Sequence, residues 1–324
     1  MRATRRSLLA IVAAGAAVAC AGARAAWPER PVKIVVPFAP GAMGDILARM
    51  LGQELQQALG QPVVVENKAG AGGNIGSGAV ARASPDGHTF LVGATNNFVI
   101  NQIVYPNLGF DPLRAFDPVS MLVDVPSVLL SSALIAPRSV AELIEASRKQ
   151  PGRFNYGSPG NATTPHLWLD EISRTRDMKM THVPYQGAAQ VVQALITNEV
   201  QVGLFGAGVA LAQIRAGRIR ALAVSSDERL ASLPDVPTFA EAGLGKIEGG
   251  NWWALAAPAG TPPDSVDRLA GLVQAIFAKP AIRARLLELG VVPAAGGPAA
   301  LARTWQDDAA RWKKRIDASG AKIN

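Results

Sequence analysis

Short β-branched runs alternate with amphipathic helical segments along most of the chain. Residues 32–36 form such a run, and apolar positions then recur at helical spacing from 46 to 59, where Gly60 and Pro62 end the helix. Strands that alternate with helices predict a largely parallel sheet in an open α/β fold. Further strands are expected at 63–65, 89–92, 119–123, 128–131, 154–156, 180–183, 200–205, 219–224 and 252–256, and further helices at 75–82, 140–149, 165–174, 188–198, 209–216, 264–278, 281–289 and 299–318.

The strand–helix pattern restarts after the pair of apolar runs near residues 119 and 131, which predicts two lobes. A chain of 324 residues is long for one compact domain and comfortable for two. The predicted division is a signal peptide at 1–25, a first lobe made of 26–125 plus 250–324, and a second lobe at 126–249.

The first 25 residues are typical of an export signal. Three arginines lie within 2–6, an apolar stretch covers 8–19, and the small residues Ala23 and Ala25 offer a cleavage site. The apolar stretch is too short to remain as a membrane span. We therefore expect cleavage after Ala25 and a mature protein in the periplasm.

Cys20 is the only cysteine of the chain, so no disulfide, thiol catalysis or cysteine-based metal site is expected in the mature protein. Residues 17–20 also resemble a lipoprotein processing site, in which Cys20 would carry the lipid anchor. Residues 4–9 resemble a twin-arginine signal. The export route therefore stays open.

The formal net charge of +7 is concentrated at the start of the chain. Without the four arginines of the first 25 residues, 28 basic side chains face 25 acidic ones, which leaves +3. The remaining charges are evenly scattered, and no stripe of basic residues interleaved with aromatic ones is present. The sequence therefore argues against nucleic acid as a partner.

The usual enzyme signatures are missing. Ser158 does not sit in a nucleophile elbow, because Tyr156 occupies the position of the first glycine. The Gly-rich stretch 70–76 has the wrong spacing for a dinucleotide site, since Ile75 stands where the third glycine belongs. The three histidines lack metal-ligand spacing. We expect no catalytic residue, cofactor or metal.

Two loops, at 38–45 and 157–164, each join the carboxyl end of a strand to the start of a helix. Ligands bind at such strand ends in open α/β sheets, and the free N–H groups and dipole of a helix N-terminus favour an anion. Ordinary turn chemistry, with Asp45 as a helix cap, is the alternative. One such loop in each half predicts two anion-binding walls that face each other across a cleft.

Several longer stretches carry a resemblance to a known family. They include VVPFAPG at 35–41, GQPVVVENK at 60–68, GAGGNIG at 70–76, PDG at 85–87, HVPY at 182–185, LPDVPT at 233–238 and APAGTP at 257–262. With them the chain resembles, from Trp27 to Lys322, the substrate-binding proteins of tripartite tricarboxylate transporters, the Bug or TctC-like family.

The resemblance implies an α/β periplasmic-binding-protein fold, in which hinge strands join two lobes that close on a ligand. It implies capture of a small organic carboxylate and its delivery to membrane permease subunits, without catalysis, and we expect a monomer. A ligand-sensing partner of a receptor kinase and, less favoured, a soluble enzyme acting on a carboxylate are the alternatives. Both Gly-rich loops match the family's carboxylate-binding loops.

Two departures from the family pattern bear on the ligand. Members often have two glycines where this chain has Gly41 and Ala42, and Met43 then adds an adaptable apolar wall. Many members place an aspartate in the cleft where this chain has Gly206 and Ala207. An acid there could pair with an ammonium group, so we hypothesise a ligand without a charged amine and with apolar or aromatic bulk.

The expected ligand-binding residues come mainly from the two loops, with a few additions from neighbouring strand ends. They are Phe38, Gly41, Ala42, Met43, Gly44, Asp45, Asn97, Ser158, Gly160, Asn161, Thr163, Thr164, His166, Tyr185, Gly206 and Ala207.

Overall fold

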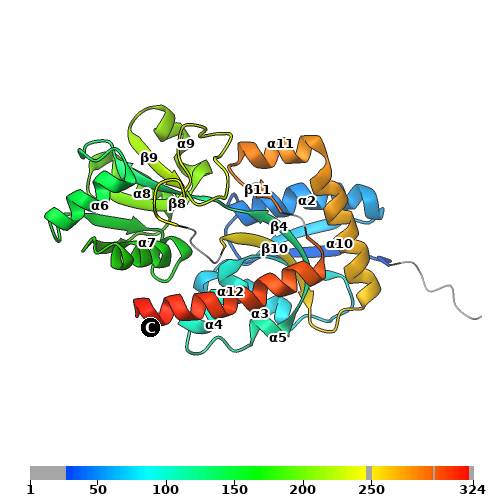
Figure 1. The fold of residues 1–324 in the computed structure, drawn as a ribbon. Helices are drawn as coiled ribbons and strands as arrows, with labels where there is room; N and C mark the ends of the chain where they lie inside the picture. The colour runs from blue at the N-terminus through cyan, green and yellow to red at the C-terminus, as the bar shows by residue number, and fades with distance from the viewer. Residues whose placement is uncertain (1–26, 246–249, 295, 321–324) are drawn as a thin grey trace, which may run out of the picture.

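The computed structural model describes residues 27–245, 250–294 and 296–320, so the predicted signal peptide and Cys20 lie outside the described residues. Within them, the strands form two sheets, and helices pack on both to give two α/β lobes (Figure 1). We call the lobe of the six-stranded sheet the first lobe and that of the five-stranded sheet the second lobe. The predicted two-lobed periplasmic-binding-protein fold is confirmed.

The first sheet has the strand order β11–β4–β10–β3–β1–β2, and the second has β7–β6–β8–β5–β9. The strands of the first sheet are β1 Val32–Val36, β2 Val63–Asn67, β3 Thr89–Ala94, β4 Phe116–Asp124, β10 Trp252–Pro258 and β11 Val292–Pro293. Those of the second are β5 Ser127–Ser132, β6 Asn155–Ser158, β7 Thr181–Pro184, β8 Val202–Gly206 and β9 Ile219–Val224.

The longer helices lie close to their expected positions, whereas the short helices and turns between residues 71 and 73 and between 96 and 115 were not expected. They are α2 Met43–Leu59, α3 Asn74–Ala81, α4 Asn101–Val104, α5 Pro112–Ala115, α6 Val140–Lys149, α7 Thr164–Thr175, α8 Ala188–Thr197, α9 Ala207–Arg215, α10 Pro263–Ala278, α11 Pro280–Glu288 and α12 Pro298–Ser319, with a 3-10 turn η1 at Ala71–Gly73 and a π-helical turn η2 at Asn96–Ile100. Helix α2 ends as expected, at Gly60 in the left-handed region.

The prediction of largely parallel sheets is wrong, because both sheets are mixed. β1 pairs in parallel with β2 and β3, whereas β10 runs antiparallel to β3 and β4. In the second sheet β6 pairs in parallel with β7 and β8, whereas β5 runs antiparallel to β8 and β9. The path of the chain explains the antiparallel pairs. β5 and β10 each begin at the boundary between the lobes, where the chain has just crossed over, whereas β8 and β3 end at that boundary.

Two crossing segments lie side by side between the lobes. Residues 125–126 join β4 to β5, residues 250–251 lead into β10, and the Val125 N–H donates to the Asn251 carbonyl at 2.7 Å. The buried Thr95 hydroxyl accepts from the Trp252 N–H at 2.8 Å and ties the second segment to the end of β3. The two crossing segments, joined by these hydrogen bonds, correspond to the hinge strands of a two-lobed fold.

Strand register shows which loops reach the boundary between the lobes. Ala94, the last residue of β3, pairs with Trp253 beside the crossing segment, and Gly206, the last residue of β8, pairs with Ser127 just after it. The other parallel strands of each sheet run in the same directions as β3 and β8. The loops after β1 and β6 therefore both lie at the boundary.

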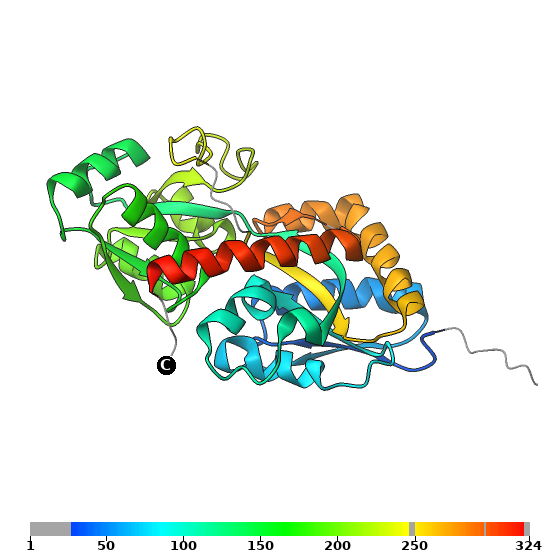
Figure 2. The same cartoon turned by 60° about the horizontal axis from the view of Figure 1, so that its bottom comes forward.

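Helix α12 makes a third connection between the lobes. It packs on β4 of the first lobe, and its last turns reach α7 of the second lobe (Figure 2). Trp312 is fully buried, stacks on Trp168 with ring centroids 6.4 Å apart, and is covered by the Arg315 guanidinium. Arg315 also pairs with Glu171 of α7. The predicted division assigns all of α12 to the first lobe, but α12 contacts both lobes. The division into 26–125 plus 250–324 and 126–249 therefore stays a prediction.

Candidate functional site

The loop after β1 leads to a helix N-terminus with free donors. The Asp45 and Ile46 N–H groups donate to the Ala42 carbonyl, but the Met43 and Gly44 N–H groups have no hydrogen-bond partner among the described residues. Ala42, the N-cap, offers no side-chain cap either. Two donors at the positive end of a 17-residue helix are thus available to an anion.

Asp45 braces this loop. Its Oδ2 accepts from the Gly41 N–H at 2.9 Å and from Arg49 Nε at 3.0 Å. Arg49 also reaches Asn67, whose amide donates to the Phe38 carbonyl. The hydrogen bonds and charge of Arg49 lower the pKa of the Asp45 carboxyl despite its burial. The Gly41 N–H and the Arg49 Nε are consequently occupied, whereas the Met43 and Gly44 N–H groups stay available.

Trp253 of β10 forms the wall behind this helix start. A methyl group on Gly44 would lie 2.3 Å from Trp253 Cζ3, so only glycine fits here. The Phe38 ring meets the Trp253 ring edge-on, with centroids 5.2 Å apart. The Trp253 side chain is buried, and it also sets the position of the first loop.

The loop after β6 is held by two histidines. Ser158 is fully buried, and its Oγ donates to the Gly160 carbonyl at 2.9 Å and lies 2.7 Å from His182 Nε2. The Ala162 N–H donates to His166 Nδ1 at 3.0 Å. Sequence reasoning missed His182, because 24 residues separate it from Ser158 and only the pairing of β6 with β7 brings the two together.

A serine and a histidine within hydrogen-bond distance are also the elements of a nucleophile–base pair. Burial, and secondarily His166, lower the pKa of His182 to about 4, which makes it a weak base at neutral pH. No carboxylate orients its Nδ1 within the part of the chain that the structure describes. The geometry supports a bracing role for the pair.

The start of α7 resembles the start of α2. Thr164 is buried and its hydroxyl has no hydrogen-bond partner in the described ranges. The N–H groups of Thr163 and Thr164 are equally free there, while the Thr163 hydroxyl donates to the Gly160 carbonyl at 2.8 Å. Asn161 at the tip of the loop is exposed. A ligand oxygen would satisfy these buried donors.

Gly206 and Ala207 lie where β8 passes into α9, beside the crossing segment. A methyl group on Gly206 would lie 3.0 Å from Val125 Cγ1, and one on Gly208 would lie 2.4 Å from the Leu289 carbonyl oxygen of the first lobe. The start of α9 therefore packs closely against the end of α11. As the sequence indicates, residues 206–208 bring no carboxylate to this place.

Asn97 and Tyr185 are engaged within the protein. Asn97 is buried, and its side chain accepts from the Ala94 N–H and donates to the Gly72 carbonyl. The Tyr185 hydroxyl donates to Glu199 Oε1 at 2.9 Å, and burial together with Glu199 raises the Tyr185 pKa to about 12. Asn97 thus joins the end of β3 to the turn η1, and Tyr185 joins the segment after β7 to Glu199.

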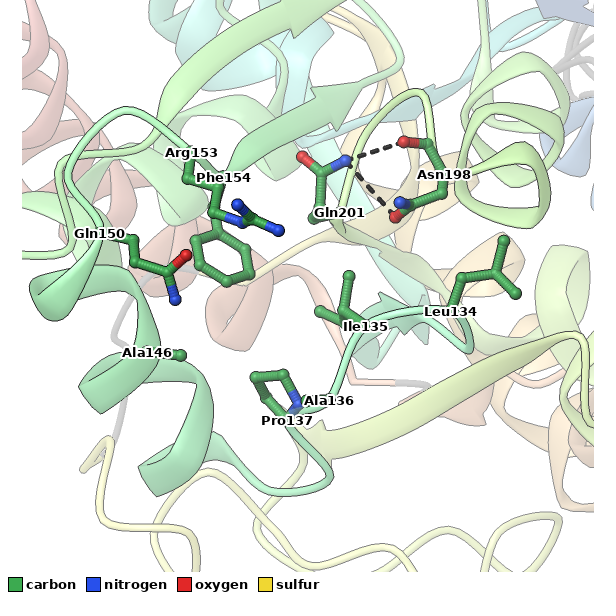
Figure 3. A pocket seen from close by; sticks show the side chains of 10 residues that line it. All are labelled: Leu134, Ile135, Ala136, Pro137, Ala146, Gln150, Arg153, Phe154, Asn198 and Gln201. Carbon is green, nitrogen blue, oxygen red and sulfur yellow. Dashed lines mark hydrogen bonds between the residues drawn. The ribbon is translucent and has the colours of Figure 1, made fainter.

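A cavity of about 370 Å³ lies elsewhere, at the end of the second sheet remote from the boundary (Figure 3). The Arg153 guanidinium points into it over the Phe154 ring, and the Gln201 amide is bonded to Asn198. Arg220 supports the loop that lines it, donating to the carbonyls of Ala133, Ile135 and Pro137 at 2.7, 2.7 and 3.2 Å. This cavity is separate from both predicted loops.

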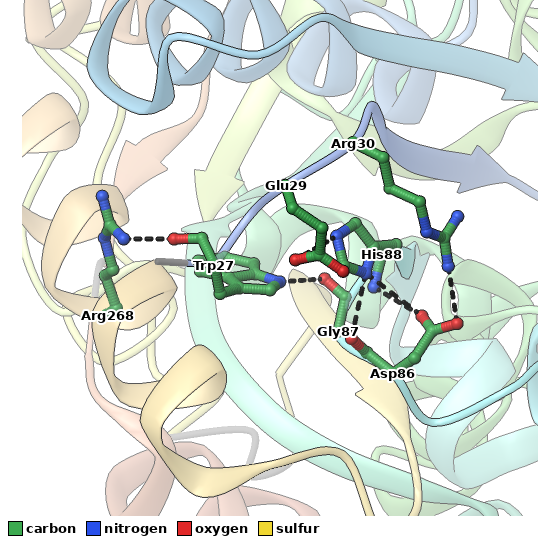
Figure 4. A network of polar contacts seen from close by, with 7 residues as sticks. All are labelled: Trp27, Glu29, Arg30, Asp86, Gly87, His88 and Arg268. Atoms are coloured by element: carbon green, nitrogen blue, oxygen red, sulfur yellow. Dashed lines mark hydrogen bonds and ion pairs between the residues drawn. The ribbon is translucent and has the colours of Figure 1, made fainter. Parts of the chain in front are cut away.

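His88, the third histidine, lies at the outer end of the first sheet. It is buried between Asp86 and Glu29, beside Trp27 (Figure 4). The Trp27 indole donates to the Gly87 carbonyl at 2.8 Å, and Arg268 bonds the Trp27 carbonyl. This network fixes the beginning of the described chain far from the boundary.

Among the described residues, no helix has the length and hydropathy of a membrane span. The same residues contain no cluster of three or more potential metal ligands of the His, Cys, Asp or Glu type.

Comparison with known proteins establishes the family. The family model described as "Tripartite tricarboxylate transporter family receptor" matches residues 47–321. The chain belongs to this receptor family. A protein from the tcbD–tcbE intergenic region of Pseudomonas sp. strain P51 is 37% identical over 292 residues, which cover 90% of this chain and 87% of that protein. The resemblance inferred from sequence is thereby confirmed.

Two similar solved structures carry bound acids. Rpa4515 from R. palustris with adipate is 33% identical, has a TM-score of 0.82 and matches over 91% of this chain and 99% of that one. MatC from Rhodopseudomonas palustris with bound malate is 32% identical, has a TM-score of 0.76 and matches over 90% and 100%. These similarities cover both lobes.

Proposed function

We propose that this receptor captures a small organic carboxylate between its two lobes in the periplasm and delivers it to membrane permease subunits. The observation that carries the proposal is the pair of helix N-termini, of α2 and α7, whose unsatisfied N–H groups come from different lobes and lie at one boundary. Adipate and malate in the two related structures are dicarboxylates, which two such walls would suit.

The recognition chemistry is that of backbone donors. One carboxylate would accept from the Met43 and Gly44 N–H groups, and the other end of the ligand from the Thr163 and Thr164 N–H groups and the Thr164 hydroxyl. Helix dipoles favour negative charge at both places. In the first loop the nearby guanidinium is neutralised by Asp45. Lobe closure about the crossing segments would then bury the acid, with 26–125 plus 250–324 and 126–249 as the proposed moving units.

The start of α9 narrows the ligand class. Residues 206–208 offer no carboxylate to pair with an ammonium group, and the Phe38 and Trp253 rings add apolar surface beside the first loop. We therefore expect acids without a charged amine to bind, and aspartate and glutamate to bind poorly.

A thermal-shift screen of the chain from Ala26 tests the proposal. The protein would first be unfolded and refolded to remove bound ligand. A ligand that binds only the folded state raises the melting temperature. We expect a rise with a subset of adipate, malate, citrate and benzoate. No rise with any of these acids, or a rise with aspartate and glutamate alone, would contradict the proposal.

Met43→Pro tests the first wall specifically. Met43 is the first residue of α2, where proline is tolerated, and Ala42 before it already has the extended φ and ψ of −71° and 162° that proline requires. The substitution removes one N–H donor. Hydrogen bonds to charged groups contribute about 1.5–3 kcal/mol, so binding of the acid found in the screen should weaken roughly 10- to 100-fold. Met43→Leu keeps the donor and should bind normally.

A further inference from the structure

The second loop depends on two histidines stacked face to face. The rings of His166 and His182 have centroids 3.7 Å apart and planes inclined by 8°, and Tyr156 packs beside them with its centroid 5.0 Å from that of His182. His166 bonds Ala162 and His182 bonds Ser158. The pair therefore holds both ends of the segment 158–162.

The hydrogen bonds define the protonation state of each ring. Because the Ala162 N–H donates to His166 Nδ1, that nitrogen has to carry a lone pair, and the neutral ring bears its proton on Nε2. The Ser158 hydroxyl uses its proton on the Gly160 carbonyl, so it accepts from a proton on His182 Nε2. His166 is thus neutral in the arrangement that the structure shows, and the lowered pKa of His182, about 4, keeps that ring neutral at pH 7.5 as well.

Protonation would break this arrangement. A proton on His166 Nδ1 removes the acceptor of the Ala162 N–H, and a second charge would place two cations in stacked contact. Ala162 has a φ of +55°, a conformation that a non-glycine residue adopts only when its surroundings enforce it. Loss of its hydrogen bond would release the loop just before the free donors of Thr163 and Thr164.

The charged and titratable groups around the pair are few. On α7, Asp170 attracts a proton to His166, but Asp170 is itself paired with Arg174 at 2.7 Å. Tyr156 on β6 has its pKa raised by burial, and Tyr185, after β7, is bonded to Glu199. Burial outweighs Asp170 and lowers the pKa of His166, while burial and His166 lower that of His182 to about 4.

We propose that His166 and His182 are positioning residues, which hold the Ser158–Thr164 loop ready for an anion only while both rings are neutral. The inference rests on the proposed function, because it assigns a role to one wall of the same site. Acidification then releases the loop and weakens binding. Simple attraction between an imidazolium and a carboxylate would instead make binding stronger on acidification.

The test compares adipate affinity from pH 7.5 to 4 in the wild type and in a His166→Asn/His182→Gln double variant. Asparagine Oδ1 can replace Nδ1 as the acceptor from Ala162, and glutamine Nε2 can replace the donor to Ser158, but neither side chain titrates. Equal melting temperatures at pH 7.5 would confirm intact folding. His88→Asn, which alters the remote histidine, serves as the matched control.

The adipate affinity of each protein at lower pH is compared with its own value at pH 7.5. On acidification the wild type should lose affinity more steeply than the double variant, by at least about twofold more at the pH where half of His166 is protonated, because that proton removes the acceptor of the Ala162 N–H. The protonation of adipate itself affects both proteins alike. Parallel pH profiles, or tighter wild-type binding in acid, would overturn the proposal while leaving carboxylate capture intact.

A measurement without ligand keeps the proposal testable even if adipate does not bind. The amide proton of Ala162 in the NMR spectrum should move with the titration of His166 and lose its hydrogen-bonded shift in acid. In His166→Asn the shift should stay constant over the same range. An Ala162 amide that ignores pH in the wild type would refute the positioning role independently of any ligand.

Discussion

Gly44 offers the sharpest test of how the first wall is built. A methyl group at this position would lie 2.3 Å from Trp253 Cζ3 and 2.7 Å from Cη2, so the indole would have to move. Trp253 packs in turn on Phe38 and lies in a buried strand, which leaves it little room. Overpacking of this kind costs about 1–3 kcal/mol.

Gly271 provides the matched comparison. It lies inside α10, and a methyl group there would meet nothing within 4 Å. Alanine is favoured over glycine in a helix interior by about 0.8–1 kcal/mol. Gly271→Ala should therefore raise the free energy of unfolding by that amount. Gly44 is the second residue of α2, where the helix-propensity gain of alanine is smaller than in a helix interior. The cost of the clash with Trp253 exceeds this gain, so we expect Gly44→Ala to lower the free energy of unfolding by about 1–2 kcal/mol.

Urea unfolding followed by tryptophan fluorescence and circular dichroism measures both variants. Adipate binding should also weaken in Gly44→Ala, because the displaced indole shifts the start of α2, and it should stay unchanged in Gly271→Ala. If Gly44→Ala were as stabilising as Gly271→Ala, the close packing of Trp253 on the helix start would be refuted.

Three further variants, one of them with a control, test the contacts that hold loops in place. Asp45→Asn removes the charge that holds the first loop and should cost about 1–2 kcal/mol in urea unfolding, with no loss contradicting the role. The pKa of His182 falls from 6.5 to about 4 on folding, so its contribution to stability is complete above pH 6.5 and is lost as the pH drops towards 4. The thermal stability of His182→Gln should decline less over this interval, and an identical decline would refute the assignment. Arg220→Lys cannot reproduce the bonds to three carbonyls and should lower the melting temperature, whereas Arg153→Lys, beside the same cavity, should not.

Most helices and strands could be predicted because each carries a local signal. Helix α6 matches its expected bounds at 140–149, since Ser139 caps it and accepts from the Glu142 N–H. The turn η2 and the short α5 were missed, as neither is long enough to show a helical period. Strand direction was also missed, because periodicity records which face of a strand is buried and not which neighbour it pairs with.

The candidate site divides in the same way. The two loops could be located from glycines and helix starts, which are local features. Their bracing could not, because the Ser158–His182 and Gly44–Trp253 contacts join residues that are far apart in the sequence and meet only through strand pairing. Gly41 and Asp45 are close in sequence, yet the sequence does not show that the Gly41 N–H is bonded to the Asp45 carboxylate. Only the structure distinguishes this N–H from the free ones of the same loop.

A crystal structure of the protein with the acid selected by the thermal-shift screen tests the central claim most directly. The account predicts one carboxylate within hydrogen-bond distance of the Met43 and Gly44 N–H groups and the opposite end of the ligand at Thr163 and Thr164, with both lobes closed on it. An acid bound in the cavity beside Arg153, or held by side-chain cations with those four N–H groups left in water, would contradict it.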